Sequence, residues 1–188
     1  DESEKYQFEP RWSLNKDTPQ QGLSHMDFLE AFSENFYFSA NGVLQKRQDV
    51  LNAGGYDASQ RQRNDVDQFM RVLADKTWTW HPRPGWCYRV DTPGNLSCNF
   101  AGREYYMLRC LLKNRKAYAG ETMNWMIPHF AKRAMSTALA DGTAEDVHRA
   151  SELAFEHLRR RHQWIFRIAM RVPGLYRMLL GVKRRMVA

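Results

Sequence analysis

Two short motifs at a fixed spacing constrain this chain more than its composition does. The first, Gly54-Gly55-Tyr56-Asp57, follows a brief segment with helical character, and its glycines predict a helix end at Gly54 and then a turn. The second, Asn64-Asp65-Val66-Asp67, opens an amphipathic segment with helical spacing, for which Asn64 is a suitable N-cap and Asp67 a capping-box partner. Paired carboxylates are therefore expected at the start of a helix, shortly after a glycine turn.

The rest of the chain predicts a mixture of strands and helices. Aromatic and β-branched residues favour strands at 36–41, 43–44, 77–80 and 86–90. Ser24 and Thr143, each with an aspartate three residues later, predict capping boxes at the start of two helices. The second of these is expected to be one long helix with an apolar stripe of Val147, Ala150, Ala154, Leu158, Ile165 and Ile168. The Ser24 box starts a helix at 25–35. Further helices are expected at 49–53, 100–114, 121–139 and 175–186, and Pro128 should end or kink the helix at 121–139.

The order of the two motifs resembles the middle of family 2 glycosyltransferases of the GT-A fold, in which a Gly-Gly-aromatic-Asp turn precedes an acid-Asp-x-Asp helix start. Residues 1–13 resemble the family segment that follows the Asp-x-Asp metal motif. The resemblance implies an α/β fold, with 1–115 as the acceptor-side part of a GT-A mixed-sheet domain and 116–188 as a helical extension with a basic amphipathic tail. It also implies that the nucleotide-binding half precedes Asp1, so we expect this chain to be a C-terminal piece of a longer polypeptide.

The same resemblance assigns roles to individual residues. Asp65 would be the general base of an inverting transfer, and the partial positive charge at a helix N-terminus favours its ionised form. Asp91 stands where the family often has a metal-proximal His, and it would help to hold a divalent cation, Mg²⁺ or Mn²⁺, whose other ligands lie mostly outside this chain. The residues expected to bind substrate are Gly54, Gly55, Asp57, Asn64, Asp67, Arg71, Arg89 and Trp86.

Each of these positions also has a purely structural interpretation. Asn64 and Asp67 serve simply as helix caps in that view, and Asp65 decorates the first turn. The glycine pair ends a helix without any ligand, and Arg71 holds an acidic partner or lies in solvent. The order and spacing of the two motifs favour the functional interpretation for Asp65.

The positive charge of the chain is concentrated at its end. After Glu156 the sequence has no acid but nine basic residues, and the residues before them carry 19 basic and 21 acidic side chains, a net charge of −2. Aromatic and aliphatic residues between these arginines favour contact with an anionic membrane surface. Nucleic acid binding through phosphate neutralisation and a packed helix with a solvated face are the alternatives. No nucleic acid partner is expected, since no recognised reading motif accompanies the charge.

The expected function is transfer of a sugar from a nucleotide-diphosphate-sugar donor to a hydroxyl of a glycan or lipid-linked acceptor. The alternative is a non-catalytic module that binds an anionic membrane or a protein partner through its basic helices. Three cysteines without paired spacing favour a reducing cytoplasm, with peripheral attachment to the inner face of the cell membrane. No apolar run approaches the roughly 20 residues that span a bilayer.

Overall fold

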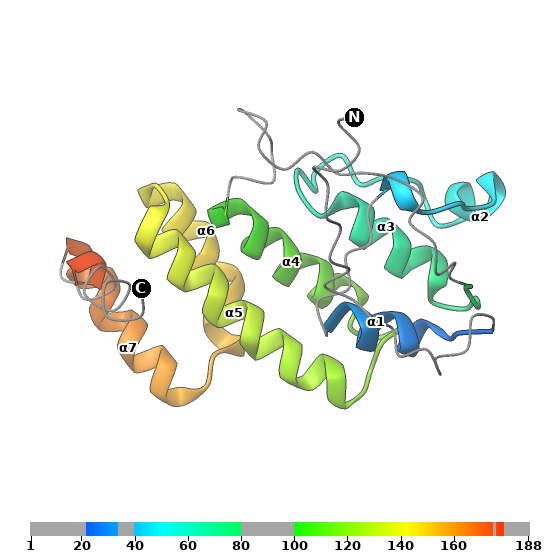
Figure 1. Cartoon of the computed structure of the whole chain (residues 1–188). Coiled ribbons are helices and arrows are strands. Elements are labelled where there is room, and N and C mark those ends of the chain that lie inside the picture. Colours follow the sequence, from blue (N-terminus) through cyan, green and yellow to red (C-terminus); the bar gives the residue numbers. More distant parts are fainter. Residues whose placement is uncertain (1–21, 34–39, 80–99, 175, 179–188) are drawn as a thin grey trace, which may run out of the picture.

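The structure is a computed structural model that describes residues 22–33, 40–79, 100–174 and 176–178. The described elements are helices packed side by side, with α1 to α3 at one end and α7 at the other (Figure 1). Their bounds are α1 His25–Ser33, η2 Ala40–Gly42, α2 Arg47–Asn52, α3 Asn64–Leu73, α4 Phe100–Asn114, α5 Glu121–Asp141, α6 Ala144–Ala154, η4 Phe155–His157 and α7 Arg160–Arg171.

The expected α/β fold with a mixed sheet is wrong for the described part of the chain, which contains helices and no β-strand. Its one β-type pairing is an isolated antiparallel bridge between Leu23 and Trp78, with N to O distances of 3.0 and 2.8 Å. The Trp78 ring lies edge-on to Phe28 of α1, and its Nε1 donates to the Ser24 carbonyl across 2.8 Å. Trp78 therefore packs against α1 instead of extending a sheet.

The other predicted strands are either replaced or not described. Ala40–Gly42 forms the 3-10 helix η2, and residues 43–46 have no regular structure, because Asn41 and Gly42 favour a tight turn. The segments 34–39 and 80–99 lie outside the described residues, and with them the predicted strand at 86–90.

Local helix signals are confirmed at both capping boxes. Ser24 Oγ accepts from Asp27 N across 3.3 Å, and Asp27 Oδ2 accepts from Ser24 N across 2.6 Å. The matching pair at Thr143 and Asp146 starts α6. The bounds predicted for α4 are those observed, and Gly54 follows the end of α2 as expected.

The cap predicted for α3 is wrong. Arg63, in the left-handed region at φ 57°, is the N-cap, and Asp67 makes no capping-box bond. The Asp67 side chain turns inward instead, where three side chains of α3 and α4 donate to it. The apolar stripe of α3 is confirmed, since Val66, Phe69 and Met70 are buried.

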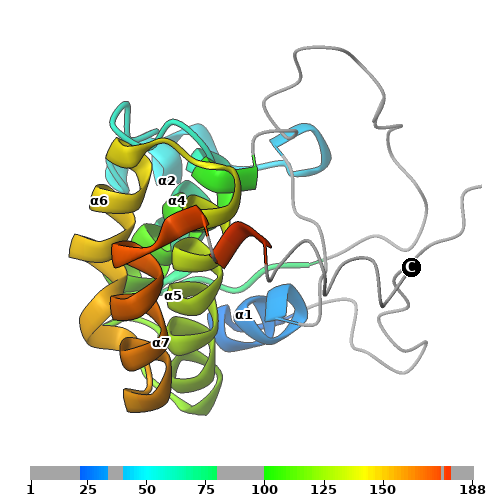
Figure 2. The same cartoon turned by 90° about the vertical axis from the view of Figure 1, so that its left-hand side faces the viewer.

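One hydrophobic core joins α1, α3, α4, α5, α6 and α7. The largest interface joins α4 to α5, and α6 packs on α5 (Figures 1 and 2). Buried Glu104 of α4 pairs with Arg133 of α5 at 2.8 Å, and Tyr118, between these helices, donates to the Met70 carbonyl of α3 across 2.9 Å. The core is continuous on both sides of residue 115. The main core residues include Phe28, Leu29, Phe69, Met70, Met107, Leu108, Leu111, Met123, Met126, Met135, Leu139, Leu158 and Phe166.

The long helix predicted after Thr143 is broken. α6 ends at Ala154, η4 follows, and Leu158 is extended and buried before α7 begins. Gln163 Nε2 donates to the carbonyls of Phe155 and Leu158, at 3.2 and 3.1 Å, and so ties the start of α7 to the break. By contrast, α5 continues through Pro128, where buried neighbours such as Ile127 and Ala131 hold the helix in place.

Candidate functional site

The Gly54-Gly55 turn has a conformation that requires glycine. Both residues have positive φ, 83° and 65°, which side chains disfavour. Their amides close the end of α2, since Gly54 N donates to the Leu51 carbonyl and Gly55 N to the Val50 carbonyl, each across 2.9 Å. The turn therefore leads the chain sharply from α2 toward Asp57.

Arg71 of α3 holds this turn in place. Its Nη1 donates to the Ala53 carbonyl, and its Nη2 donates to the Gly55 carbonyl across 2.6 Å. Its Nε donates to Asp67 Oδ2 of the same helix across 3.1 Å. One guanidinium thus joins the glycine turn to α3, which is the acidic-partner role among those considered for Arg71.

Asp67 is the buried centre of a polar cluster. Its side chain is fully buried (0% exposed) and accepts from Arg71, from Lys113 Nζ at 3.0 Å and from Asn114 Nδ2 at 3.2 Å. A buried carboxylate with two cationic partners and an amide donor is well compensated. Asp67 therefore fastens α3 to α4.

Asp57 joins the same cluster from the turn. Its Oδ1 accepts from the Ser59 amide and hydroxyl, at 2.9 and 2.5 Å, and Lys113 Nζ lies 3.0 Å from its Oδ2. The Ser59 hydrogen bonds, then Lys113, hold the pKa of the Asp57 carboxyl well below its usual range. Arg109 Nη2 is 3.9 Å from the same carboxylate and also donates to Ser59 Oγ across 2.6 Å. We call Asp57, Asp67, Arg71, Arg109 and Lys113 the ion-pair network.

Lys113 occupies the position between the two acids. Burial opposes its charged form, but hydrogen bonds to Asp57 and Asp67 outweigh that effect and raise the pKa of the Lys113 ammonium. A divalent cation does not fit here, because the ammonium already lies between the two carboxylates. No group of three or more metal-ligating side chains occurs among the described residues.

Asp65 and Asn64 lie outside the ion-pair network. Asn64 is exposed, and its Oδ1 accepts from Asp65 N across 2.9 Å. Asp65 is partly exposed, and its Oδ1 accepts from Val66 N across 2.9 Å, the one interaction of its carboxylate with the described part of the chain. Asp65 is thus the carboxylate of the two motifs that no described cation neutralises.

The structure therefore groups the predicted site residues in two sets. Gly54, Gly55, Asp57, Asp67 and Arg71 are brought together by the ion-pair network. Asn64 and Asp65 lie together at the exposed start of α3 and make no bond to the ion-pair network. Trp86, Arg89 and Asp91 lie outside the described residues, and their roles stay predictions.

Sequence reasoning missed the contribution of α4. Arg109 and Lys113 stand four residues apart, so both side chains reach the same side of the helix. That spacing was the available signal, together with Asn114 directly after it. The groups that they contact lie far earlier in the chain. Lys113 contacts Asp57 and Asp67 at separations of 56 and 46 residues, and Arg109 contacts Ser59 at a separation of 50 residues.

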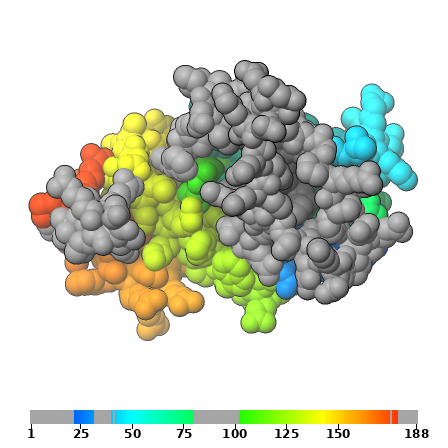
Figure 3. Space-filling model, viewed as in Figure 1, coloured from blue at the N-terminus to red at the C-terminus, as the bar shows by residue number. Residues whose placement is uncertain are grey.

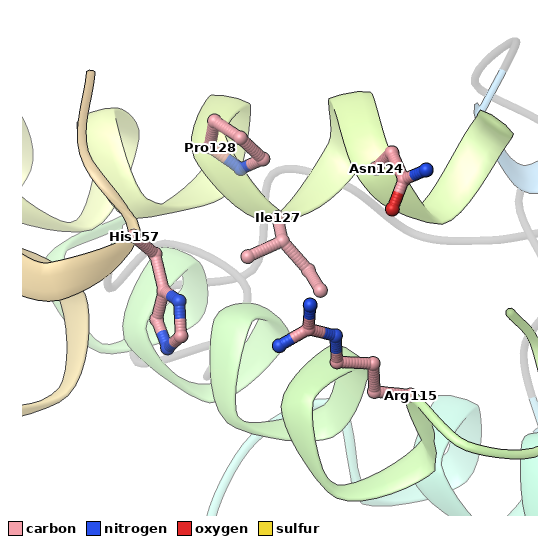
Figure 4. A pocket seen from close by; sticks show the side chains of 5 residues that line it. All are labelled: Arg115, Asn124, Ile127, Pro128 and His157. Atoms are coloured by element: carbon pink, nitrogen blue, oxygen red, sulfur yellow. The ribbon is translucent and has the colours of Figure 1, made fainter. Parts of the chain in front are cut away.

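A small hollow lies elsewhere, between the end of α4, α5 and η4 (Figure 4). Arg115, Asn124, Ile127, Pro128 and His157 line it, and the Arg115 and His157 side chains extend toward it. No carboxylate lines this hollow, so it is chemically distinct from the start of α3.

Comparisons with family models, with curated proteins and with solved structures found no match for this chain. The resemblance to family 2 glycosyltransferases of the GT-A fold is therefore corrected, because no family model supports it and the described residues form helices without the sheet it implies. The two motifs form a local arrangement of turn, helix and ion pairs, and such an arrangement does not require the fold in which a similar order of residues occurs.

Proposed function

We propose that this chain supplies the acceptor side of a glycosyl-transfer site, with the Asp65 carboxylate as general base. The donor is a nucleotide-diphosphate-sugar and the acceptor a hydroxyl of a glycan or lipid-linked molecule. We assign the donor-binding site to residues other than the described ones, since basic side chains already neutralise the carboxylates of the ion-pair network.

One observation carries the proposal: the three aspartates of the two motifs differ in their partners. Asp57 and Asp67 accept from Lys113, and Asp67 also accepts from Arg71, whereas the Asp65 carboxylate accepts a backbone amide alone in the described part of the chain. A base must keep a lone pair accessible to a substrate proton. Asp65 meets that need, and its neighbours in the motifs do not.

The ion-pair network supports the proposal because it fixes the position of α3. General bases act efficiently when a rigid element holds them in position. Arg71 and Lys113 connect α3 to the glycine turn and to α4, so the first turn of α3 is fixed from two directions. Tyr56 directly follows the glycine turn and is 51% exposed. Its aromatic ring offers a surface on which the apolar face of a sugar ring can pack.

The proposed step moves one proton and exchanges one bond. Asp65 takes the proton of the acceptor hydroxyl, and the acceptor oxygen forms a bond to the anomeric carbon with inversion. The bond from that carbon to the phosphate oxygen breaks, and its electron pair leaves with the nucleotide diphosphate. The described residues include no group of three or more metal-ligating side chains, so no step is assigned to a metal.

The test is release of nucleotide diphosphate from a panel of UDP-, GDP- and TDP-sugars by the full-length protein with mixed glycan acceptors. Asp65→Asn should lower the transfer rate by about 10² to 10⁴, the usual effect of losing a general base. Its unfolding midpoint should stay near that of the wild type, because Asp65 is outside the ion-pair network.

Asp75→Asn is the matched control, since Asp75 is an exposed acid just beyond the other end of α3. It should retain wild-type turnover. Undiminished transfer by Asp65→Asn would remove the catalytic role.

A further inference from the structure

The break after α6 changes which side of the next helix faces the core. Had the helix continued from Thr143, Ile165 and Ile168 would have shared the buried stripe of Ala150 and Ala154. Because Leu158 is extended, α7 begins in a new orientation and buries Phe166 and Ala169 instead. Ile165 and Ile168 are 43% and 41% exposed as a result.

The outer face of α7 combines apolar and cationic side chains. Arg161, Trp164, Ile165, Ile168, Arg171 and Val172 follow the i, i+3, i+4, i+7 spacing of one helix face, and all six are exposed. Trp164 is 66% exposed. We call these six residues the α7 outer face. Figures 1 and 3 show α7 at the end of the molecule opposite α2.

The exposed apolar residues are concentrated here. Five of the nine large hydrophobic residues exposed in the described part of the chain lie between Trp164 and Met178. Scattered exposed apolar residues are normal, but a contiguous group on one helix face marks an interaction surface. Figure 2 shows α7 in front of α5, and the exposure of all six side chains places this face away from the core.

Charge indicates what covers this surface. Arg159 and Arg160 adjoin the α7 outer face, and none of Arg159, Arg160, Arg161 and Arg171 has an ion-pair partner in the described part of the chain. No acid follows Glu156 in the sequence, and three more basic residues, Lys183, Arg184 and Arg185, follow α7. The last two acids before α7 in the sequence, Glu152 and Glu156, lie beside His148 and His157 at 3.5 and 3.2 Å.

We propose that the α7 outer face binds an anionic lipid surface, with the helix lying in the plane of the interface. Trp164, Ile165, Ile168 and Val172 enter the boundary between headgroups and acyl chains, while the arginines beside them meet lipid phosphates and carboxylates. A nucleic acid would use the arginines but would leave the exposed aliphatic side chains without partners. The proposal is independent of sugar transfer, and no described helix is long and apolar enough to cross a membrane.

The experiment is cosedimentation of the full-length protein with vesicles of phosphatidylcholine and phosphatidylserine, beside vesicles of phosphatidylcholine alone. The wild type should bind the anionic vesicles and not the neutral ones, and binding should weaken as salt rises. Arg161→Gln/Arg171→Gln should bind about thirtyfold more weakly, since each arginine near the leaflet contributes about 1 kcal/mol. Trp164→Ser/Ile168→Ser should bind at least about tenfold more weakly through lost apolar burial.

Matched controls make the same kinds of change elsewhere. Lys46→Gln/Arg47→Gln removes two exposed charges beside α2, and Leu44→Ser/Trp125→Ser removes two exposed apolar side chains. Both should bind like the wild type, and circular dichroism should show all variants folded. Four outcomes would overturn the proposal: no binding of the wild type at low salt, equal binding to neutral vesicles, control variants weakened as much as α7 variants, or full binding by Trp164→Ser/Ile168→Ser. If Trp164→Ser/Ile168→Ser bound the vesicles fully and RNA displaced it from them, the surface would be a phosphate-binding one instead.

Discussion

The Lys113 ammonium of α4 lies 3.0 Å from the Asp67 carboxylate of α3, which is fully buried. The two residues are 46 positions apart in the chain, so this contact fixes how the two helices sit against each other. Asp65 occupies the same first turn of α3 as Asp67 but is partly exposed. One aspartate therefore secures the helix, and the other is available at its surface.

Asp67→Asn should destabilise the fold by about 2 to 4 kcal/mol, because it removes the charge that compensates Lys113 and Arg71 in a buried setting. Asp65→Asn should change stability by less than about 0.5 kcal/mol, as expected for a surface side chain outside such a network. Urea unfolding followed by circular dichroism measures both. Equal stability of the two variants would contradict the structural role of Asp67.

Gly54→Ala should destabilise the protein by about 1 to 2 kcal/mol, the cost of the left-handed conformation for a residue with a Cβ. Space is not the cause, since a Cβ at Gly54 would lie 3.7 Å from Arg71 Nη1, an ordinary contact. Gly174→Ala is the control, because its Cβ would meet nothing within 4 Å and its φ is not positive. Thermal unfolding should place Gly54→Ala below Gly174→Ala, and the reverse order would exclude backbone strain at the turn.

Local signals predicted much of the helical part of the fold. The capping boxes of Ser24 and Thr143, the glycine after α2 and the bounds of α4 depend on residues within a few positions of one another. Such short-range chemistry can be recognised in the sequence. The start of α3 was predicted within one residue, although with the wrong cap.

Distant contacts decided the features that were predicted wrongly. The strand at 77–80 was predicted from β-propensity, which does not form a strand without a partner strand. Trp78 makes a single bridge to Leu23 and a ring contact with Phe28 instead. Burial of Leu158 broke the helix after Ala154 and moved Ile165 and Ile168 to the surface. Two of the three side chains that donate to Asp67 come from α4, so its role could not be deduced from the motif that contains it.

Acid should weaken the fold through Asp57. Its folded pKa lies below the value of about 3.9 of an unfolded aspartate. The ionised carboxylate therefore stabilises the fold above about pH 4, and this contribution is lost as pH falls below that value toward the folded pKa. Urea midpoints measured from neutral to acidic pH should fall less steeply in Asp57→Asn than in the wild type. Parallel pH profiles would show that Ser59 and Lys113 do not favour the ionised form.

Two arginines near the end of the chain should respond differently to the same substitution. Arg177 Nε donates to the Leu139 carbonyl across 3.0 Å, and its Nη2 donates to the Gly142 carbonyl across 3.3 Å. These carbonyls lie at the end of α5, where a helix leaves backbone acceptors unpaired and where its dipole favours a positive charge. Arg171 is exposed and has no such acceptor among the described residues.

Arg177→Gln should therefore lower the free energy of unfolding by about 1 kcal/mol, through lost charged hydrogen bonds at the end of α5. Arg171→Gln should leave unfolding unchanged within about 0.5 kcal/mol, because a surface charge without partners contributes little. Binding to anionic vesicles should show the opposite order, with Arg171→Gln weakened and Arg177→Gln close to the wild type while folded. If both variants lost stability equally and neither lost vesicle binding, Arg171 would belong to the packed structure rather than to the lipid-binding face.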